Sequence, residues 1–194
     1  MDGKNLKIMK DTIVCKNFTL RKLRPIEDKE SIIENINDKD VLKTLPMTFP
    51  YTDADYEKFV KIFEDEKNEI EKSSVQFIID VNGKAVGCVS LSWKLRECSK
   101  HKASLGYWLG KKYWGQGIMT EAVKILCDYA FNELGKLKLY IYALEDNIGS
   151  RKVAEKNGFK FECMTEKDVF KEEKYKNLVY YGKFNPKYKV INEK

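Results

Sequence analysis

The chain has 194 residues, of which 43% are hydrophobic and 34% are charged, a balance typical of a globular protein with a heavily ionised surface. This length favours one domain, which we expect to occupy residues 1–194. The net charge of +6 comes from 36 basic and 30 acidic residues spread along the chain, which argues against a nucleic-acid-binding block and suits an anionic cofactor.

Two further features narrow the class of protein. No apolar run approaches membrane-spanning length, and "MDGKNLKIMK" at the N-terminus lacks the apolar core of a signal peptide, so we expect no membrane contact and a cytoplasmic location. The five cysteines are scattered and form no CxxC pair, and the chain has a single histidine. This pattern predicts neither a disulfide framework nor a metal site.

The first elements are a strand and a helix. "FTLRKLRP", residues 18–25, alternates like a strand and stops at the proline. Residues 26–38 then predict a helix with Ile32, Ile33 and Ile36 on one face.

A loop and a second helix come next. "LPMTFPYT", residues 45–52, contains two prolines that exclude regular structure. Residues 53–70 carry aromatic and aliphatic side chains at helical spacing, with Asp53 or Asp55 as the expected N-cap.

The clearest local signal is a β-hairpin over residues 74–95. Asn82-Gly83 supplies the two positive-φ residues that a tight primed turn needs. Two adjacent antiparallel strands are therefore predicted.

The second half alternates strands and helices. The long helix over 117–134 has a predicted apolar stripe of Ile118, Ala122, Ile125 and Tyr129, and ends at Gly135. The other predicted elements are strands at 102–110, 136–144, 159–165 and 178–184 and a short helix at 147–157, closed by Gly158. Strands outnumber helices, which predicts an α+β fold.

The junction between the strand at 102–110 and the long helix has the properties of an anion site. A helix N-terminus presents unpaired N–H groups and a partial positive charge. Gly115 and Gly117 remove the side chains that would keep an anion from the backbone. The turn lacks the Gly-Lys-Ser/Thr ending of a Walker loop and the third glycine of a Rossmann fingerprint. By itself, Gly-x-Gly also fits a turn in which glycine only permits the backbone path.

The surrounding residues resemble a known family. "KYWGQG", Lys112 to Gly117, is similar to the Q/R-x-x-G-x-G/A motif of the GNAT acetyltransferase superfamily, with lysine at its first position. "YWLGKKYWGQGIMTEAV" resembles the branch of the ribosomal-protein N-terminal acetyltransferases. Further matches follow in order: "LRKLRPIED", "LPMTFPYT", "EDNIGSRKVAEKNGFKFE" and "KYKNLVYYG". The resemblance covers about Phe18 to Phe184 and implies an α/β/α sandwich around a mixed, mostly antiparallel sheet that is splayed in the middle.

The resemblance implies transfer of an acetyl group from acetyl-coenzyme A to a primary amine by direct attack, without a metal. It places the pantetheine arm against the backbone of the strand around Tyr107, Trp108 and Leu109, where that strand splays from the strand at 136–144. The side chains of Trp108 and Trp114 are expected to be ordinary core or surface aromatics. The glycine turn, with Lys112 at the first position of the motif, is expected to bind the cofactor. The pyrophosphate is expected to accept hydrogen bonds from the backbone N–H groups of Gly115, Gln116, Gly117, Ile118 and Met119.

Two residues near the last helix complete the expected site. Asn147 and Ser150 lie three residues apart, so both side chains can project to the same side. Asn147 also fits a helix N-cap. The resemblance implies that Asn147 contacts the pantetheine arm and that Ser150 lies near the thioester sulfur. Relatives often place a tyrosine where this chain has Ala154, so Ser150 is the predicted general acid.

The general base is left open. Relatives often have carboxylates where this chain has Ser104 and Asn177. Glu97, His101 and Glu145 remain as titratable candidates on expected solvated loops, beside a water relay or backbone carbonyls. His101, flanked by two lysines, is expected at the surface.

The missing carboxylates keep an alternative open, in which the chain binds acyl-coenzyme A as a sensor or interaction module without turnover. The amine acceptor is either a protein N-terminus or a small molecule. Residues 45–52 and 93–102 are expected to shape its pocket. The chain is expected to act as a monomer or a homodimer.

Overall fold

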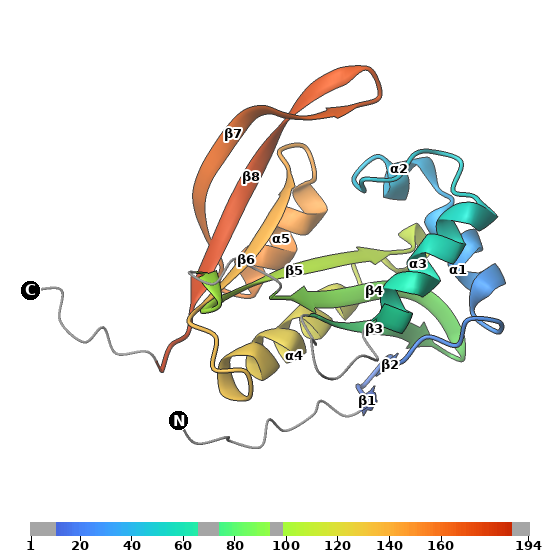
Figure 1. Cartoon of the computed structure of the whole chain (residues 1–194), viewed down its shortest axis with the longest axis horizontal. Helices are drawn as coiled ribbons and strands as arrows, with labels where there is room; N and C mark the ends of the chain where they lie inside the picture. The colour runs from blue at the N-terminus through green and yellow to red at the C-terminus, as the bar shows by residue number, and fades with distance from the viewer. Residues whose placement is uncertain (1–10, 66–73, 94–98, 188–194) are drawn as a thin grey trace, which may run out of the picture.

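The computed structural model describes residues 11–65, 74–93 and 99–187. They form an eight-stranded sheet in the order β1-β2-β3-β4-β5-β6-β8-β7, with helices against both faces (Figure 1). Only β5 and β6 pair in parallel, so the fold is the predicted mixed, mostly antiparallel α+β arrangement. The strands are β1 (Thr12–Val14), β2 (Thr19–Arg21), β3 (Ser74–Val81), β4 (Lys84–Ser92), β5 (Lys102–Leu109), β6 (Lys138–Leu144), β7 (Lys160–Lys171) and β8 (Lys174–Phe184).

Two apolar layers sandwich the sheet. On β3, Phe77 packs with the larger cluster beneath α4 (Ile118–Asn132) and α5 (Ile148–Lys156). Its neighbour Ile78 faces the opposite cluster, formed with α1 (Lys29–Ile36), α2 (Lys39–Leu42) and α3 (Asp53–Asp65). This alternation follows from the two-residue period of a strand buried on both faces. No helix within the described ranges is long and apolar enough to cross a membrane.

The β3–β4 hairpin forms as predicted. Asn82 and Gly83 both have positive φ, at 53° and 82°. The predicted positive-φ glycines after α4 and α5, Gly135 and Gly158, are also confirmed.

Two local predictions were wrong in detail. The expected strand over 18–25 shortens to β2 because the Arg24 N–H binds the Asp28 carboxylate at 2.8 Å and turns the chain. The N-cap of α3 is Thr52, not Asp53 or Asp55: the Thr52 hydroxyl accepts from the Asp55 N–H at 3.3 Å, and the Asp55 carboxylate accepts from the Thr52 N–H at 3.1 Å. These reciprocal bonds form a capping box.

The predicted stripe of α4 was only partly right. Ile118 and Ala122 are buried, but Ile125 and Tyr129 are half-buried. The helix lies flat on the sheet, so its buried face is broader than one stripe and includes Val123, Leu126, Cys127, Ala130 and Phe131.

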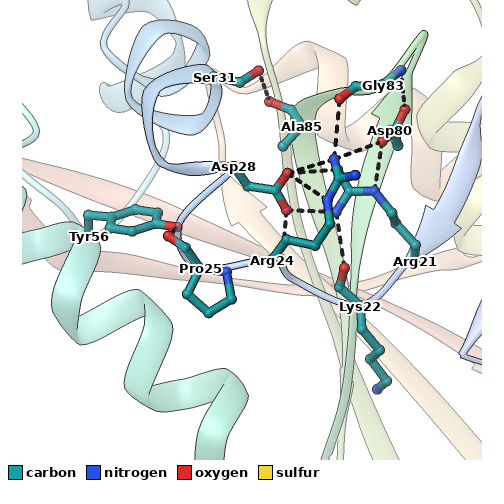
Figure 2. A network of polar contacts seen from close by, with 10 residues as sticks. All are labelled: Arg21, Lys22, Arg24, Pro25, Asp28, Ser31, Tyr56, Asp80, Gly83 and Ala85. Carbon is teal, nitrogen blue, oxygen red and sulfur yellow. Dashed lines mark hydrogen bonds and ion pairs between the residues drawn. The ribbon is translucent and has the colours of Figure 1, made fainter.

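A buried ionic network joins β2, the start of α1 and the β3–β4 hairpin (Figure 2). The Arg21 guanidinium donates to both oxygens of Asp28, at 2.6 and 2.8 Å, and to Asp80 at 2.7 Å. Arg24 pairs with Asp28 at 3.0 Å. Burial opposes ionisation of Asp28, but the hydrogen bonds from Arg21 and Arg24 outweigh it and hold the pKa of Asp28 below its usual value. The network fixes the loop that leads into α1.

Candidate active site

A gap opens in the sheet between β5 and β6. These fully described strands pair only where Lys102–Ser104 lie beside Lys138–Tyr140. Beyond that point β5 continues to Leu109 bonded to β4, and β6 continues to Leu144 bonded to β8. The predicted splay is therefore present, and it leaves two inner strand edges facing each other. Such edges can pair with an extended ligand as if it were another strand.

The glycine turn lies beyond the end of β5. After a 3-10 turn at Lys111–Tyr113, Gly115 and Gly117 adopt φ of 76° and 80°, and α4 begins at Ile118. Gly117 is the N-cap and supplies no side-chain hydrogen bond to the first turn of the helix. A Cβ added at either glycine would meet no atom within 4 Å, so the turn faces open space. The first N–H groups of a fifteen-residue helix are thus available to an anion.

The residues around this turn support it. The Trp114 Nε1–H donates to the Leu109 carbonyl at 2.7 Å, and the Gln116 side chain donates to the Lys112 carbonyl at 3.0 Å. The Lys112 ammonium pairs with Glu34 of α1 at 3.1 Å. Trp114 lies at the surface, as expected, and holds the end of β5 to the turn.

Asn147 and Ser150 come together at the start of α5. The Asn147 Oδ1 accepts from the Ser150 N–H at 3.1 Å, so the expected N-cap is confirmed. The Ser150 Oγ lies 2.9 Å from the hydroxyl oxygen of Tyr107 on β5, and that hydroxyl also donates to the Ser150 carbonyl at 3.2 Å. The serine is therefore oriented through both its backbone and its side chain.

Tyr107 was not among the predicted site residues as a side chain. It shares one face of β5 with Leu105 and Leu109, against the cluster beneath α4. Burial raises the pKa of Tyr107 to about 12, against a smaller lowering by its hydrogen bond to Ser150. The two-residue period of β5 could have shown that Tyr107 points toward the α4 and α5 layer.

Trp108 points to the other face of β5. Its side chain is 7% exposed and belongs to the cluster beneath α1 and α3, so it is a core aromatic as expected. Within the described part of the chain, the Trp108 Nε1 and the hydroxyl of Tyr51 are buried without a hydrogen-bond partner. Burial raises the pKa of Tyr51 well above its usual value.

The candidate bases lie in different places. His101 is exposed at the start of β5, as expected, and Glu97 lies outside the described residues. The Asn177 side chain donates to the exposed Glu145 carboxylate at 2.9 Å and accepts from the Lys167 N–H at 3.0 Å. Asn177 therefore ties the end of β6 to a bulge in β7. Among the described residues, no group of three histidine, cysteine, aspartate or glutamate side chains is placed to hold a metal ion.

The tip of the β7–β8 hairpin closes onto the loop at residues 45–52. The Lys171 ammonium donates to the carbonyls of Leu45 and Met47, the latter at 2.7 Å. Burial lowers the pKa of Lys171. The hairpin is thereby joined to the α2–α3 connection, on the opposite side of the gap in Figure 1.

Known proteins have similar sequences. Residues 17–160 match the family profile described as the Acetyltransferase (GNAT) domain. YdaF of Bacillus subtilis (strain 168), provisionally named a ribosomal N-acetyltransferase, is 30% identical over 171 residues, 87% of this chain and 92% of YdaF. "Probable N-acetyltransferase YjcK" from the same organism is 42% identical over 84 residues, 43% of this chain and 46% of YjcK.

Solved structures agree with this assignment. A crystal structure titled "Probable acetyltransferase" superposes with a TM-score of 0.75 at 28% identity, covering 91% of this chain and 98% of that one. RimL, a ribosomal L7/L12 N-acetyltransferase in complex with coenzyme A, has the same fold with a TM-score of 0.75 at 18% identity, over 89% and 96% of the two chains. By its sequence match over most of its length and by its fold, the chain belongs to the GNAT acetyltransferase family.

Proposed function

We propose that this acetyltransferase moves the acetyl group of acetyl-coenzyme A directly to a primary amine in a ternary complex, within a single domain and in the cytoplasm. One observation carries the proposal: the gap between β5 and β6 leads to an open glycine turn at the N-terminus of α4, and Ser150 contacts Tyr107 on β5, one wall of that gap. An extended arm ending in a pyrophosphate fits both features, because strand edges bind extended chains and helix N-termini bind phosphates.

The proposed contacts are mostly backbone contacts. The N–H groups of Gly115, Gln116, Gly117, Ile118 and Met119 hold the pyrophosphate. The backbone of Trp108 and Leu109 binds the pantetheine arm as an added strand. The N-cap of α5 uses the Asn147 Oδ1, which leaves the Nδ2 of the same amide to donate to the arm.

The chemistry needs a neutral amine and a protonated leaving group. The amine nitrogen attacks the thioester carbon, the C–S bond breaks, and the departing sulfur takes a proton. Ser150 supplies that proton from its hydroxyl, and the proton lost by the amine passes to solvent. Solvent then restores the proton of Ser150, so the proton count is unchanged.

The acceptor class is inferred from the relatives. One relative is provisionally named for ribosomal acetylation. Another, the Spermidine N(1)-acetyltransferase of Escherichia coli (strain K12), is 26% identical over 161 residues, 81% of this chain and 82% of the relative. We therefore propose a peptide N-terminus or a small polyamine-like molecule as the acceptor, bound where the hairpin tip meets residues 45–52.

A binding experiment with a matched control tests the donor site. Gly117→Val should weaken acetyl-coenzyme A binding at least tenfold by calorimetry, because a branched side chain at φ 80° both strains the turn and blocks the N–H groups. Gly83→Val carries the same strain at φ 82°, also with open space around the Cβ, but lies in the β3–β4 turn. It should bind acetyl-coenzyme A as the wild type does. Equal affinity in the two variants would contradict the proposed site.

Turnover is tested separately. The wild type is incubated with acetyl-coenzyme A and a panel of peptides with free N-termini, polyamines and amino sugars, and products are detected by mass. Acetylated product from any amine supports the enzyme. Tight donor binding without any product would instead favour a sensor that binds acyl-coenzyme A without turnover.

A further inference from the structure

Tyr107 and Ser150 form a side-chain pair across 43 residues of sequence. The two hydroxyl oxygens lie 2.9 Å apart, and the Tyr107 hydroxyl is also 3.2 Å from the Ser150 carbonyl. Tyr107 projects from β5, one wall of the gap, and Ser150 lies in the first turn of α5. The pair therefore joins the strand that would hold the donor to the helix that would protonate it.

The direction of the hydrogen bond between the hydroxyls decides what Ser150 can do. Each hydroxyl has one proton to donate and two lone pairs that accept. If Ser150 donated to Tyr107, its proton would be engaged and would not reach a sulfur. The Tyr107 proton already points at Ser150, because the Ser150 carbonyl at 3.2 Å can only accept. If that proton is shared between the carbonyl and the Oγ in a three-centre bond, the serine proton is free to turn toward the departing sulfur.

We propose that Tyr107 is a positioning residue that shares its hydroxyl proton between the carbonyl and the Oγ of Ser150 and so directs the serine proton toward the thioester sulfur. This inference rests on the proposed function. As the serine O–H bond breaks and the S–H bond forms, negative charge develops on the Ser150 Oγ. The hydrogen bond from Tyr107 stabilises that charge, and Tyr107 itself keeps its proton throughout.

The surroundings of Tyr107 suit a donor that stays neutral. Its ring packs with the cluster that includes Leu105 and Leu109 on the same face of β5 and Cys127 of α4. Burial raises its pKa to about 12, so the phenol remains protonated at neutral pH. A fixed, neutral donor beside a developing oxyanion needs little reorganisation during the reaction.

A buried tyrosine that only satisfies its hydroxyl would have different consequences on substitution. Tyr107→Phe removes one oxygen and keeps the ring, so both roles allow a folded protein. The matched control is Tyr56→Phe, because Tyr56 is also buried and its hydroxyl donates to the Pro25 carbonyl at 2.8 Å, among the residues of Figure 2 and not at Ser150. A merely structural role predicts the same small loss of melting temperature and an unchanged kcat in both variants.

The deciding experiment is a double-mutant cycle with the best amine of the screen. We expect Tyr107→Phe to lower kcat about tenfold, since one hydrogen bond to a charged transition state is lost, with little change in affinity for acetyl-coenzyme A. Tyr56→Phe should keep the wild-type kcat. In the Ser150→Ala background, Tyr107→Phe should have no further effect on kcat, because Tyr107 acts only through the serine hydroxyl.

Three results would overturn the inference. One is a kcat for Tyr107→Phe within about twofold of the wild type. The second is an undiminished tenfold effect in the Ser150→Ala background, which would show that Tyr107 acts independently of the serine. The third is a Ser150→Ala variant with wild-type kcat, which would show that the serine is not the proton donor. Failure of the proposed donor site would appear in a different measurement. Gly117→Val would then bind acetyl-coenzyme A as tightly as the control Gly83→Val.

Discussion

At the scale of single residues, Ser150 is the side chain on which the proposed chemistry depends. The structure separates its hydroxyl from the helix cap, which Asn147 provides. The hydroxyl is left to Tyr107 and to the donor. This division allows the catalytic and structural roles at the start of α5 to be tested with two substitutions.

Ser150→Ala should lower kcat by roughly 10- to 1,000-fold with little change in donor affinity or melting temperature, because the hydroxyl acts mainly in the transition state. Asn147→Ala should instead lower the melting temperature and the donor affinity more than it lowers kcat. It removes the cap, which costs about 1 kcal/mol of stability, and it weakens donor binding. Melting curves and steady-state kinetics on both variants check this. A wild-type kcat in folded Ser150→Ala would refute the catalytic assignment.

Asp28 controls the acid stability of the fold. Its folded-state pKa lies below the unfolded value, so its contribution to stability is complete above about pH 4 and is lost as the pH falls through the folded-state pKa. Asp28→Asn should reduce the free energy of unfolding by about 3 kcal/mol at pH 7, because the substitution removes the buried carboxylate that pairs with the largely buried Arg21 and with the half-exposed Arg24. It should also flatten the dependence on pH below 4.

The control for this substitution is Asp53→Asn. Asp53 pairs with Lys29 at 3.2 Å with its side chain 72% exposed, so its loss should change stability by less than about 1 kcal/mol. Urea unfolding of both variants at several pH values measures the difference. Equal losses in the two variants would show that the Arg21–Asp28 network contributes no more than a surface ion pair.

At the scale of elements, the strands of the β7–β8 hairpin are much longer than the sequence predicted. The predicted strands at 159–165 and 178–184 extend to Lys171 and begin at Lys174. The turn between them uses Glu172 and Glu173 at φ of 51° and 59°, a conformation that favours glycine or asparagine. Most of β7 is exposed, so its side chains show no buried alternation. Local sequence therefore could not indicate this hairpin, and its tip is held instead by Lys171.

Lys171→Met should release the tip from the loop at residues 45–52. Because those residues are proposed to border the acceptor, kcat/KM for the amine should fall roughly tenfold, the scale of losing one or two charge-assisted hydrogen bonds. The KM for acetyl-coenzyme A should stay unchanged. Lys174→Met, an exposed lysine across the same turn, serves as the control and should leave both values as in the wild type. Matching kinetics in the two variants would remove the hairpin tip from the acceptor site.

Other elements show which signals in the sequence were sufficient. Asn82-Gly83 predicted its hairpin because the turn chemistry is local, and Asn147 predicted its cap for the same reason. The α3 cap was misplaced by one or three positions because Thr52, Asp53 and Asp55 are all good caps, and only the reciprocal bonds identify the threonine. The pairing of Tyr107 with Ser150 depends on how β5 and α5 pack, so the sequence between them carries no sign of it.

At the scale of the whole molecule, the gap between β5 and β6 organises the site. The glycine turn, Asn147 and Ser150 were predicted from short segments and from a family resemblance. The structure adds how the sheet brings them together: the strands pair at Lys102–Ser104 and Lys138–Tyr140, then separate. Because α4 and α5 follow β5 and β6 along the chain, both helices begin just beyond the open end of the gap.

Hydrogen exchange should show the gap being filled. Addition of coenzyme A should slow amide exchange in residues 105–109 and 141–144, since the pantetheine arm would bond to inner strand edges that have no strand partner among the described residues. Amides that pair β3 with β4 lie outside the gap and should exchange at unchanged rates. Protection confined to residues 115–119 would indicate that only the pyrophosphate is held and that the arm lies outside the sheet.

The inner edges of β5 and β6, where acetyl-coenzyme A would bind, also make the stability of the protein depend on the concentration of this ligand. A ligand that completes the sheet binds the folded chain and not the unfolded one, and at a hundred times its Kd it adds about 2.7 kcal/mol to stability by mass action. When acetyl-coenzyme A is scarce, that increment disappears and a larger fraction of the chains opens to proteolysis. The amount of the enzyme in the cell, and not only its reaction rate, would then rise and fall with the concentration of acetyl-coenzyme A.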